Sequence, residues 1–321
     1  MGIDVTALAA LTERAGFTDR SDRGRLWIAG ADALDLLNRL TTNKLETLPD
    51  GTARSTVLTN GDARVLDHLR LAAVDGGMWC LTSPGRAEDV ADWTDLYTFG
   101  EEITVADRSE ETAQFTVAGP LAGDALARAG FPVPPPDGVL SVGDGAVVAS
   151  PFGTHPAYDI LLPLAAADGV GRSLREIANE VDAATFDAYR IAQGVPAYDS
   201  EFGAFNNPLE ARLLGSISDD KGCYTGQEVI ARLQTYRKVQ RLLMSFTSDA
   251  PAVAGDALEA EDGSPAGAVT SAFDTGDGRT RGLALVAAKH LSADSSLRLA
   301  GGGSLTLSEP AYALATEPVE A

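Results

Sequence analysis

Blocks of alternating apolar and polar residues in the first third of the chain predict a mixture of strands and helices. Residues 23–48 predict a strand, a turn and a helix that begins near Asp32. Three leucines share one face of this helix: Leu34, Leu37 and Leu40. Residues 55–82 predict a β-meander whose first turn is Asn60-Gly61, the strongest two-residue signal for a β-hairpin. A further helix is predicted near residues 85–98.

The order of strand and helix repeats in the middle of the chain. The predicted elements are a strand at 113–119, a helix directly after it, a proline-rich loop, a strand at 157–163 and helices at 170–180 and 183–193. From about Thr247 onward, short strands alternate with glycine-rich turns, a pattern typical of a small β-barrel or sandwich. The chain is therefore predicted to have an α+β fold, with half-domains at approximately 1–110 and 111–245 and a β-barrel at 246–321.

The length and composition agree with a globular protein of two or more domains. The chain has 321 residues, of which 45% are apolar and 22% are charged. Its longest apolar stretches, such as residues 283–288, are too short to cross a bilayer. Asp4 and Glu13 stand where a signal peptide would have a basic start and an apolar run. These features predict a soluble, cytoplasmic protein with no membrane partner.

The net charge of −21 comes from 46 acidic and 25 basic residues, and only four of the basic residues are lysines. Many acids, few lysines and many small residues are typical of a halophilic protein, because salt screens the self-repulsion. An acidic enzyme from a genome of high GC content is the alternative. In both cases the overall field repels nucleic acid, so no direct nucleic-acid partner is predicted. An anionic ligand would need a local basic patch.

The cysteines and histidines predict neither a disulfide framework nor a metal site. Cys80 and Cys223 are too far apart for a CxxC motif. The three histidines, His68, His155 and His290, add no metal-ligand spacing.

Residues 219–241 carry the most chemistry. Thr225 and Glu228 match a capping box, which predicts a helix that begins just after Thr225. Cys223 would then lie at the positive end of the helix dipole, with Lys221 nearby, and both effects lower a thiol pKa. Cys223 is therefore a candidate reactive cysteine. The alternative is a small residue packed in a loop.

The same segment is locally basic. Four cations follow Gly222 against the single acid Glu228: Arg232, Arg237, Lys238 and Arg241. In so acidic a chain, this cluster is the best candidate for holding carboxylates or phosphates. The alternative is a solvated helix end.

The octapeptide KGCYTGQE, followed by AR, resembles the signature of the YgfZ family of folate-binding proteins, relatives of the glycine cleavage T-protein, an aminomethyltransferase. Four more segments resemble these proteins in the expected order: GADALDLLNRLTTN, TNGDARVLDHLRL, AGPLAGDAL and FDAYRIAQGVPAYDSEF. The resemblance covers about residues 20–245. It implies pseudo-symmetric folate-binding domains that end in a β-barrel and surround a central folate cavity. T-proteins lack the Lys-Gly-Cys loop, so the resemblance favours the YgfZ side.

The resemblance also suggests roles for individual residues. Asp67 matches the first of two T-protein aspartates, which contacts the folate nitrogens that accept the one-carbon unit, and His68 replaces the second. On a regular strand, Asp67 shares an apolar face with Val65 and Leu69, so a nearby ligand amine or water would explain it. A bulge that turns Asp67 outward is the alternative.

Other matches concern the folate itself. His155 stands where T-proteins have a glutamate that grips the pterin ring, and Arg190 matches the family arginine, with a role in binding the folate tail. Tyr158 and Asp159 match a Tyr-Glu pair, although a core tyrosine explains Tyr158 equally well. The predicted catalytic residues are Cys223 and Asp67. The predicted folate-binding residues are Arg190, Lys221, Tyr224, Gln227, Arg232, Arg237, His155 and Tyr158.

The first functional hypothesis is a tetrahydrofolate-binding accessory protein that supports iron–sulfur enzymes, including tRNA-modifying ones, with Cys223 as its functional thiol. The second is an aminomethyltransferase, a folate-dependent one-carbon transferase in which Asp67 positions the folate nitrogen. The third is a thiol oxidoreductase or scaffold that uses the same fold as a framework. Reduced folate and iron–sulfur enzymes are the partners that the resemblance implies.

Overall fold

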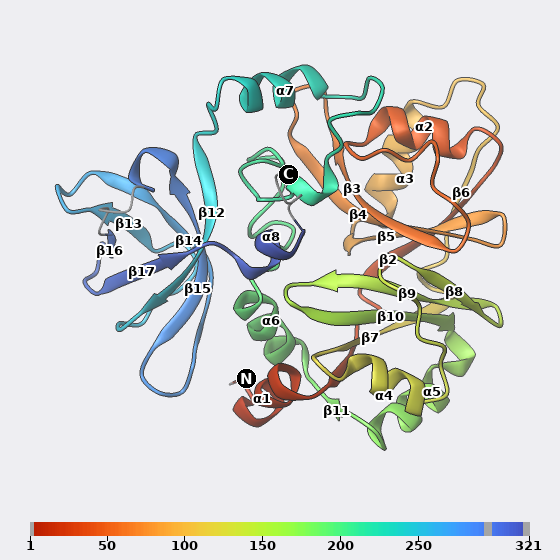
Figure 1. Cartoon of the computed structure of the whole chain (residues 1–321), viewed down its shortest axis with the longest axis horizontal. Helices are drawn as coiled ribbons and strands as arrows, with labels where there is room; N and C mark the ends of the chain where they lie inside the picture. Colours follow the sequence, from red (N-terminus) through yellow and green to blue (C-terminus); the bar gives the residue numbers. More distant parts are fainter. Residues whose placement is uncertain (1–2, 292–296, 317–321) are drawn as a thin grey trace.

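The computed structural model describes residues 3–291 and 297–316. It consists of two β-sheets with their helices and a closed β-barrel, which together surround a central region (Figure 1). No helix in these ranges is long and apolar enough to cross a membrane.

The first sheet has five strands in the order β3-β4-β5-β2-β6. Its elements are β2 (Arg23–Ala29), α2 (Ala33–Leu40), β3 (Thr52–Thr59), β4 (Val65–Val74), β5 (Gly77–Pro84), α3 (Ala87–Leu96) and β6 (Thr104–Asp107). The leucines of α2 and Val90 of α3 form one core with the apolar side chains of β2 and β4, so both helices cover the same face of the sheet. The predicted meander is present as β3, β4 and β5.

The two-residue turn predicted in this part of the chain is wrong. The β3–β4 connection is a loop of five residues, in which the Asn60 side chain accepts hydrogen bonds from the backbone N–H groups of Asp62 and Arg64. Ala63 takes the left-handed conformation in this loop, with φ of 58°. The predicted leucine face of α2 is present: Leu37 and Leu40 are buried, and Leu34 is half-buried and packs against the same core.

The second sheet has six strands in the order β11-β1-β7-β10-β9-β8. Its strands are β1 (Gly16–Asp19), β7 (Thr112–Ala118), β8 (Val139–Val142), β9 (Gly145–Phe152), β10 (His155–Pro163) and β11 (Asn179–Glu180), and its helices are α1 (Val5–Glu13), α4 (Ala122–Arg128), α5 (Ala167–Arg175) and α6 (Ala183–Ala192). Strand β1 comes from the N-terminal segment and pairs with β7, so the chain enters the second sheet before it builds the first.

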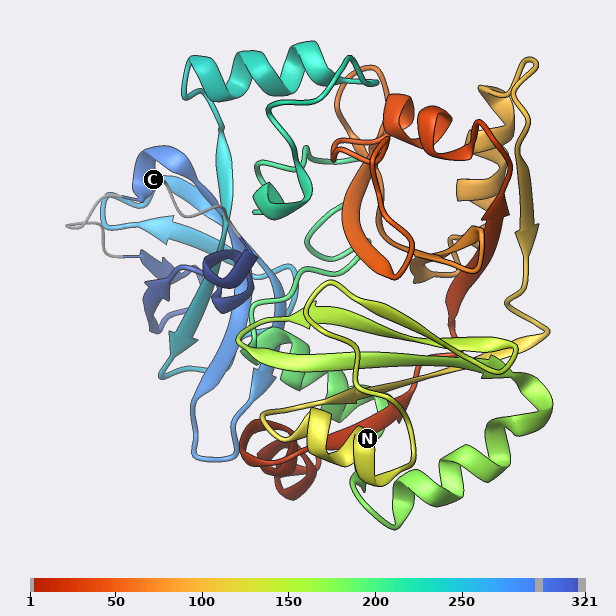
Figure 2. The same cartoon turned by 45° about the vertical axis from the view of Figure 1, so that its right-hand side comes forward.

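The second sheet lies between the first sheet and its own helices (Figure 2). Leu126 of α4 and Leu174 of α5 pack on one face of it. The other face contributes Val148 and Leu161 to a core shared with Trp79 of the first sheet. The two sheets are therefore joined by apolar contact.

Helix α7 (Gln227–Thr235) leads into the closed six-stranded barrel. The strands of the barrel are β12 (Arg241–Ser248), β13 (Ala257–Ala260), β14 (Pro265–Asp274), β15 (Thr280–Ala287), β16 (Leu297–Leu299) and β17 (Ser304–Ser308). After the barrel, α8 (Ala311–Thr316) returns to the centre, where the Tyr312 N–H donates to the carbonyl of Gln193 (Figure 1). The C-terminal segment thereby contributes to the central region.

Candidate functional site

A cavity of about 710 Å³ lies where the two sheets, α6 and α8 meet. Its wall combines charged side chains with aromatic rings. The arginines of the wall are Arg20, Arg23, Arg70 and Arg190, the aspartates are Asp19, Asp22, Asp159, Asp187 and Asp199, and the aromatic residues are Phe152, Phe186, Tyr198, Phe202 and Tyr312. Volume and lining match those of small-molecule sites, which place a few polar groups among apolar walls.

Asp159 is the buried carboxylate of this wall. It accepts hydrogen bonds from Gln114 Nε2 (3.0 Å), Thr116 Oγ1 (2.5 Å) and Ser150 Oγ (2.6 Å). Because side chains alternate along β10, the adjacent Tyr158 points to the opposite face and packs against the core of the second sheet. The strand therefore presents Asp159 to the cavity, whereas the sequence-based choice of site residue was Tyr158.

Arg190 lines the cavity, but all three nitrogens of its guanidinium group donate hydrogen bonds within the protein. Nε binds Asp187 (2.6 Å), Nη1 binds Glu201 (2.9 Å) and the Val195 carbonyl (2.7 Å), and Nη2 binds Ser271 Oγ (3.1 Å). Ser271 belongs to β14, so this arginine joins α6 to the barrel. The contacts give Arg190 a structural role.

Arg20 and Arg23 flank the turn between β1 and β2. The guanidinium carbon of Arg20 lies 5.3 Å from the centre of the Phe186 ring, and its Nε is 3.5 Å from Asp22 Oδ1. Burial, followed by the charge of Arg23, lowers the pKa of Arg20. Arg23 Nε donates to the carbonyl of Thr82 at 2.9 Å. Sequence analysis did not single out either residue.

Asp67 is fully buried on β4, so it is not turned outward. A register shift in the β3–β4 pairing does occur next to it, because Leu58 pairs with Asp67 and Thr59 pairs with Val65. It accepts hydrogen bonds from the backbone N–H groups of His68 (2.8 Å) and Ser83 (2.9 Å) and from Ser83 Oγ (2.5 Å). Burial raises the pKa of Asp67. Ser83 and His68 line the cavity, so these two residues lie between the carboxylate and the cavity space.

His68 faces the cavity from β4. Its Nε2 lies 2.8 Å from Ser216 Oγ. Burial, together with the charges of Arg23 and Arg70, lowers the pKa of His68 to about 3. The imidazole is therefore neutral at physiological pH, and the position that T-proteins fill with a second aspartate carries no charge here.

His155 contacts Tyr189 outside the lining of the cavity. Its Nδ1 is 2.9 Å from the Tyr189 hydroxyl, and the two rings are stacked with their centres 6.1 Å apart. Burial lowers the pKa of His155. The neutral ring has one donor and one acceptor nitrogen, and Nδ1 is already engaged.

The loop before α7 differs from the predicted capping box. The helix begins at Gln227, and its N-cap is Gly226, with φ of 85° and no side-chain cap. The backbone N–H of Thr225 instead donates to the Arg39 carbonyl at 2.9 Å. Cys223 is exposed four residues before the helix.

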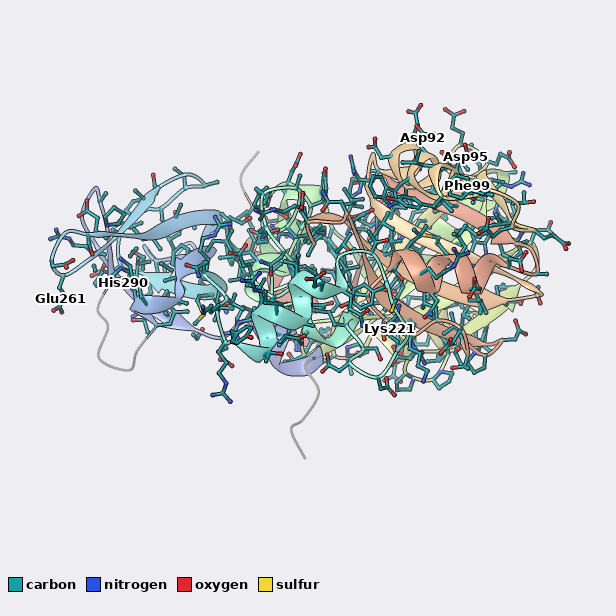
Figure 3. All side chains as sticks on the ribbon, turned by 90° about the horizontal axis from the view of Figure 1, so that it is seen from above. Asp92, Asp95, Phe99, Lys221, Glu261 and His290 are labelled. Atoms are coloured by element: carbon teal, nitrogen blue, oxygen red, sulfur yellow. The ribbon has the colours of Figure 1, made fainter. Side chains whose placement is uncertain are left out.

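Lys221 is buried and fastens this loop to the first sheet. Its Nζ donates to the carbonyls of Asn38 (2.6 Å), Thr41 (2.6 Å) and Asn43 (2.8 Å), which surround the C-terminal end of α2. Figure 3 shows Lys221 between the α7 segment and the first domain. All three ammonium donors are used, and the Tyr224 ring covers the group at 4.9 Å.

The other predicted folate-binding residues of this segment also lie outside the cavity lining. Arg232 and Arg237 are exposed, and Gln227 is half-buried. Arg232 lines a separate groove of about 320 Å³ along α7, together with Lys238. Of the ten predicted site residues, all within the described part of the chain, Arg190 alone lines the central cavity. No metal-binding cluster of His, Cys, Asp and Glu occurs among the described residues.

Comparison with known proteins connects this architecture to a group of enzymes. Residues 5–131 match the family model of the GCVT N-terminal domain. A candidate transferase of the Arabidopsis thaliana chloroplast is 28% identical over 290 residues, which are 84% of this chain and 64% of that protein. The aminomethyltransferase of Herpetosiphon aurantiacus is 25% identical over 297 residues, covering 88% of this chain and 81% of the enzyme.

The fold extends this similarity over the whole chain. The glycine cleavage system aminomethyltransferase T from Bartonella henselae superposes with a TM-score of 0.82 at 18% identity, over 98% of this chain and 91% of that one. The predicted α+β fold with T-protein-like domains and a C-terminal β-barrel is therefore confirmed. This chain is therefore similar to the GCVT N-terminal domain over residues 5–131, and it shares the fold of an aminomethyltransferase.

Proposed function

We propose that this protein binds a reduced folate, a tetrahydrofolate derivative, in the central cavity. The observation that carries the proposal is the wall of that cavity, which combines one buried carboxylate, aromatic rings and arginines. The amino-pyrimidine edge of a pterin offers N–H donors, and Asp159 can accept them while its own three hydrogen bonds hold it in place. The arginines suit the anionic tail, and the aromatic rings suit the planar parts of the ligand.

We further propose that the protein is an accessory protein of iron–sulfur enzymes, including tRNA-modifying ones, rather than a transferase. The resemblance of the KGCYTGQE loop supports this role. The position of Asp67 also supports it, because a carboxylate that assists one-carbon transfer has to reach the reacting nitrogen. Here Ser83 engages both carboxylate oxygens of Asp67 and forms the cavity wall in front of it.

Cys223 is the proposed functional thiol of this role. Its exposure outside the cavity lining suits reaction with a protein partner or an external oxidant, and not with a ligand bound in the cavity.

An aminomethyltransferase remains the second candidate. The similarity to aminomethyltransferases favours it. Purified protein, tetrahydrofolate and an aminomethyl-loaded lipoyl carrier protein would then yield methylene-tetrahydrofolate, and Asp67→Ala would abolish the product. Absence of product with the wild-type protein excludes this candidate.

Calorimetric titration with 5-formyl-tetrahydrofolate in molar KCl tests the folate proposal. Asp159→Asn should weaken binding about tenfold or more, because a charge-assisted hydrogen bond to the ligand is lost. Asp144→Asn, which removes the same charge from an exposed turn, is the matched control and should bind as the wild type does. If the folded wild-type protein does not bind, both folate-dependent functions are refuted, and a thiol-based function remains.

A further inference from the structure

Two arginines of the β1–β2 turn offer unused hydrogen-bond donors to the cavity. Arg20 follows β1 and Arg23 begins β2, and both side chains line the cavity. Within the described ranges, no oxygen accepts a hydrogen bond from the Nη atoms of either residue. The other two arginines of the wall differ, because Arg70 and Arg190 bind protein oxygens through both Nη atoms.

The environment of Arg20 compensates its charge only in part. Its side chain is 22% exposed, and its ion-pair partner Asp22 is 3.5 Å away and largely solvated. Burial and the neighbouring charge of Arg23 lower the pKa of Arg20, and the carboxylates of Asp22 and Asp159 offset this only in part. Both arginines are half-buried, and their Nη donors have no acceptor within the described part of the protein. Two neighbouring cations also repel each other. An anionic group between the two arginines would accept hydrogen bonds from these donors and reduce the repulsion.

Both guanidinium groups are also held in position. Arg20 lies over the Phe186 ring, which restricts the plane of the guanidinium group. The hydrogen bond from Arg23 Nε to the Thr82 carbonyl fixes its orientation and leaves the Nη atoms available. A carboxylate accepts two parallel N–H donors from such a group, and pre-organised donors lose less entropy when they bind it.

We infer that Arg20 and Arg23 form the anion subsite of the cavity and bind the glutamate carboxylates of the folate tail, in place of Arg190. This inference rests on the proposed folate binding. It agrees with the charge of the chain, because a protein of net charge −21 repels anions at long range and needs short, direct contacts to hold one. It also agrees with the contacts of Arg190, whose donors are occupied by Glu201, Asp187 and Ser271.

The test compares two ligands with a set of variants. The ligands are 5-formyl-tetrahydrofolate and its pteroate analogue, which lacks the glutamate. For the complete ligand, Arg20→Gln and Arg23→Gln should each raise the Kd by about tenfold to a hundredfold, as expected for a charge-assisted contact. For the pteroate analogue, both variants should bind as the wild type does. Arg172→Gln, at an exposed position of α5, is the matched control and should change neither Kd.

Two further variants keep the test decisive if the glutamine variants do not fold. Arg20→Lys and Arg23→Lys retain the charge but lose the bidentate fork, so they should fold and still bind the complete ligand more weakly than the wild type. The inference is overturned if the variants weaken both ligands equally or weaken neither. It is also overturned if the wild-type protein binds the two ligands equally well. In that case the proposal of folate binding is retained. If the wild-type protein binds neither ligand, the folate proposal and the tail assignment fail together.

Discussion

Replacing Arg190 by methionine should destabilise the protein strongly, because Glu201 would remain as an uncompensated buried carboxylate. Glu201 is fully buried and accepts hydrogen bonds from Arg190 Nη1 (2.9 Å), Ser271 Oγ (2.6 Å) and the Ala197 N–H (3.0 Å). Removing one partner of a buried ion pair costs about 3 to 5 kcal/mol of unfolding free energy. At about 2 °C per kcal/mol for a chain of this size, the Tm should fall by about 6 to 10 °C.

Asp187→Asn is the matched control, because it removes the other carboxylate that binds the same arginine. The Asp187 side chain is 54% exposed, so water screens this ion pair. Its loss should cost less than about 1 kcal/mol and shift the Tm by less than about 2 °C. The two single variants therefore separate a buried from an exposed partner of one guanidinium group.

The assay is thermal unfolding followed by circular dichroism, in molar KCl at pH 7. The double variant Arg190→Met/Glu201→Met should recover much of the lost Tm, because no buried charge then remains. The reasoning would be refuted if Arg190→Met lowered the Tm no more than Asp187→Asn did. Loss of folate binding by an Arg190 variant is informative only at temperatures where that variant is folded.

Three further predictions concern separate parts of the molecule. With excess iodoacetamide, the native protein should be alkylated at Cys223 alone, since Cys80 is fully buried, and saturating folate should leave the rate unchanged because Cys223 lies outside the cavity lining; mass spectrometry of tryptic peptides measures both. His68 stays neutral in the fold, with its pKa lowered to about 3, whereas the unfolded chain takes up this proton below about pH 6.5. As the pH is lowered through this window, the free energy of unfolding of the wild-type protein should therefore fall by about 1.4 kcal/mol per pH unit relative to that of His68→Gln. Urea titrations at pH 7 and pH 5 measure this difference, and an equal change in unfolding free energy for both proteins would contradict the neutral assignment. Gly226→Ala should cost about 1 to 3 kcal/mol, because φ is 85° and an added Cβ would lie 2.7 Å from the Asn60 carbonyl oxygen, whereas Gly222→Ala meets nothing within 4 Å and should be nearly neutral in the same urea titration.

The sequence predicted those parts of the fold whose signals are local. The meander and the barrel were recognisable because alternation and turn residues act within a few residues of each other. The predictions of a two-residue turn at Asn60-Gly61 and of a capping box at Thr225 were wrong, because contacts with distant residues determine the conformation of both segments. Gly226 packs against the backbone of Asn60 and Ala63, and Thr225 bonds to the end of α2. No local pattern reports such contacts.

The cavity was harder to predict than the fold, because its polar residues come from segments far apart in the sequence. Arg20 and Arg23 stand beside the first paired strand, whereas Asp159 lies in the middle of an apolar one. The sequence contains a weak signal for the two arginines and another for Asp159. A turn with five consecutive polar residues at 19–23 separates two apolar strands, and Asp159 interrupts the apolar residues of β10. Neither pattern could indicate that the two segments face the same space.

The structure separates the proposed ligand from the proposed thiol. Lys221 fastens the cysteine loop to the end of α2, and α2 packs on the face of the first sheet that carries Leu71. The cavity opens on the face of β4 that carries His68 and Arg70. Because residues alternate along β4, the strand itself stands between the two regions. A folate in the cavity can therefore influence Cys223 only through movement of the first sheet or of the loop, and a protein partner could reach the thiol while the cavity is filled.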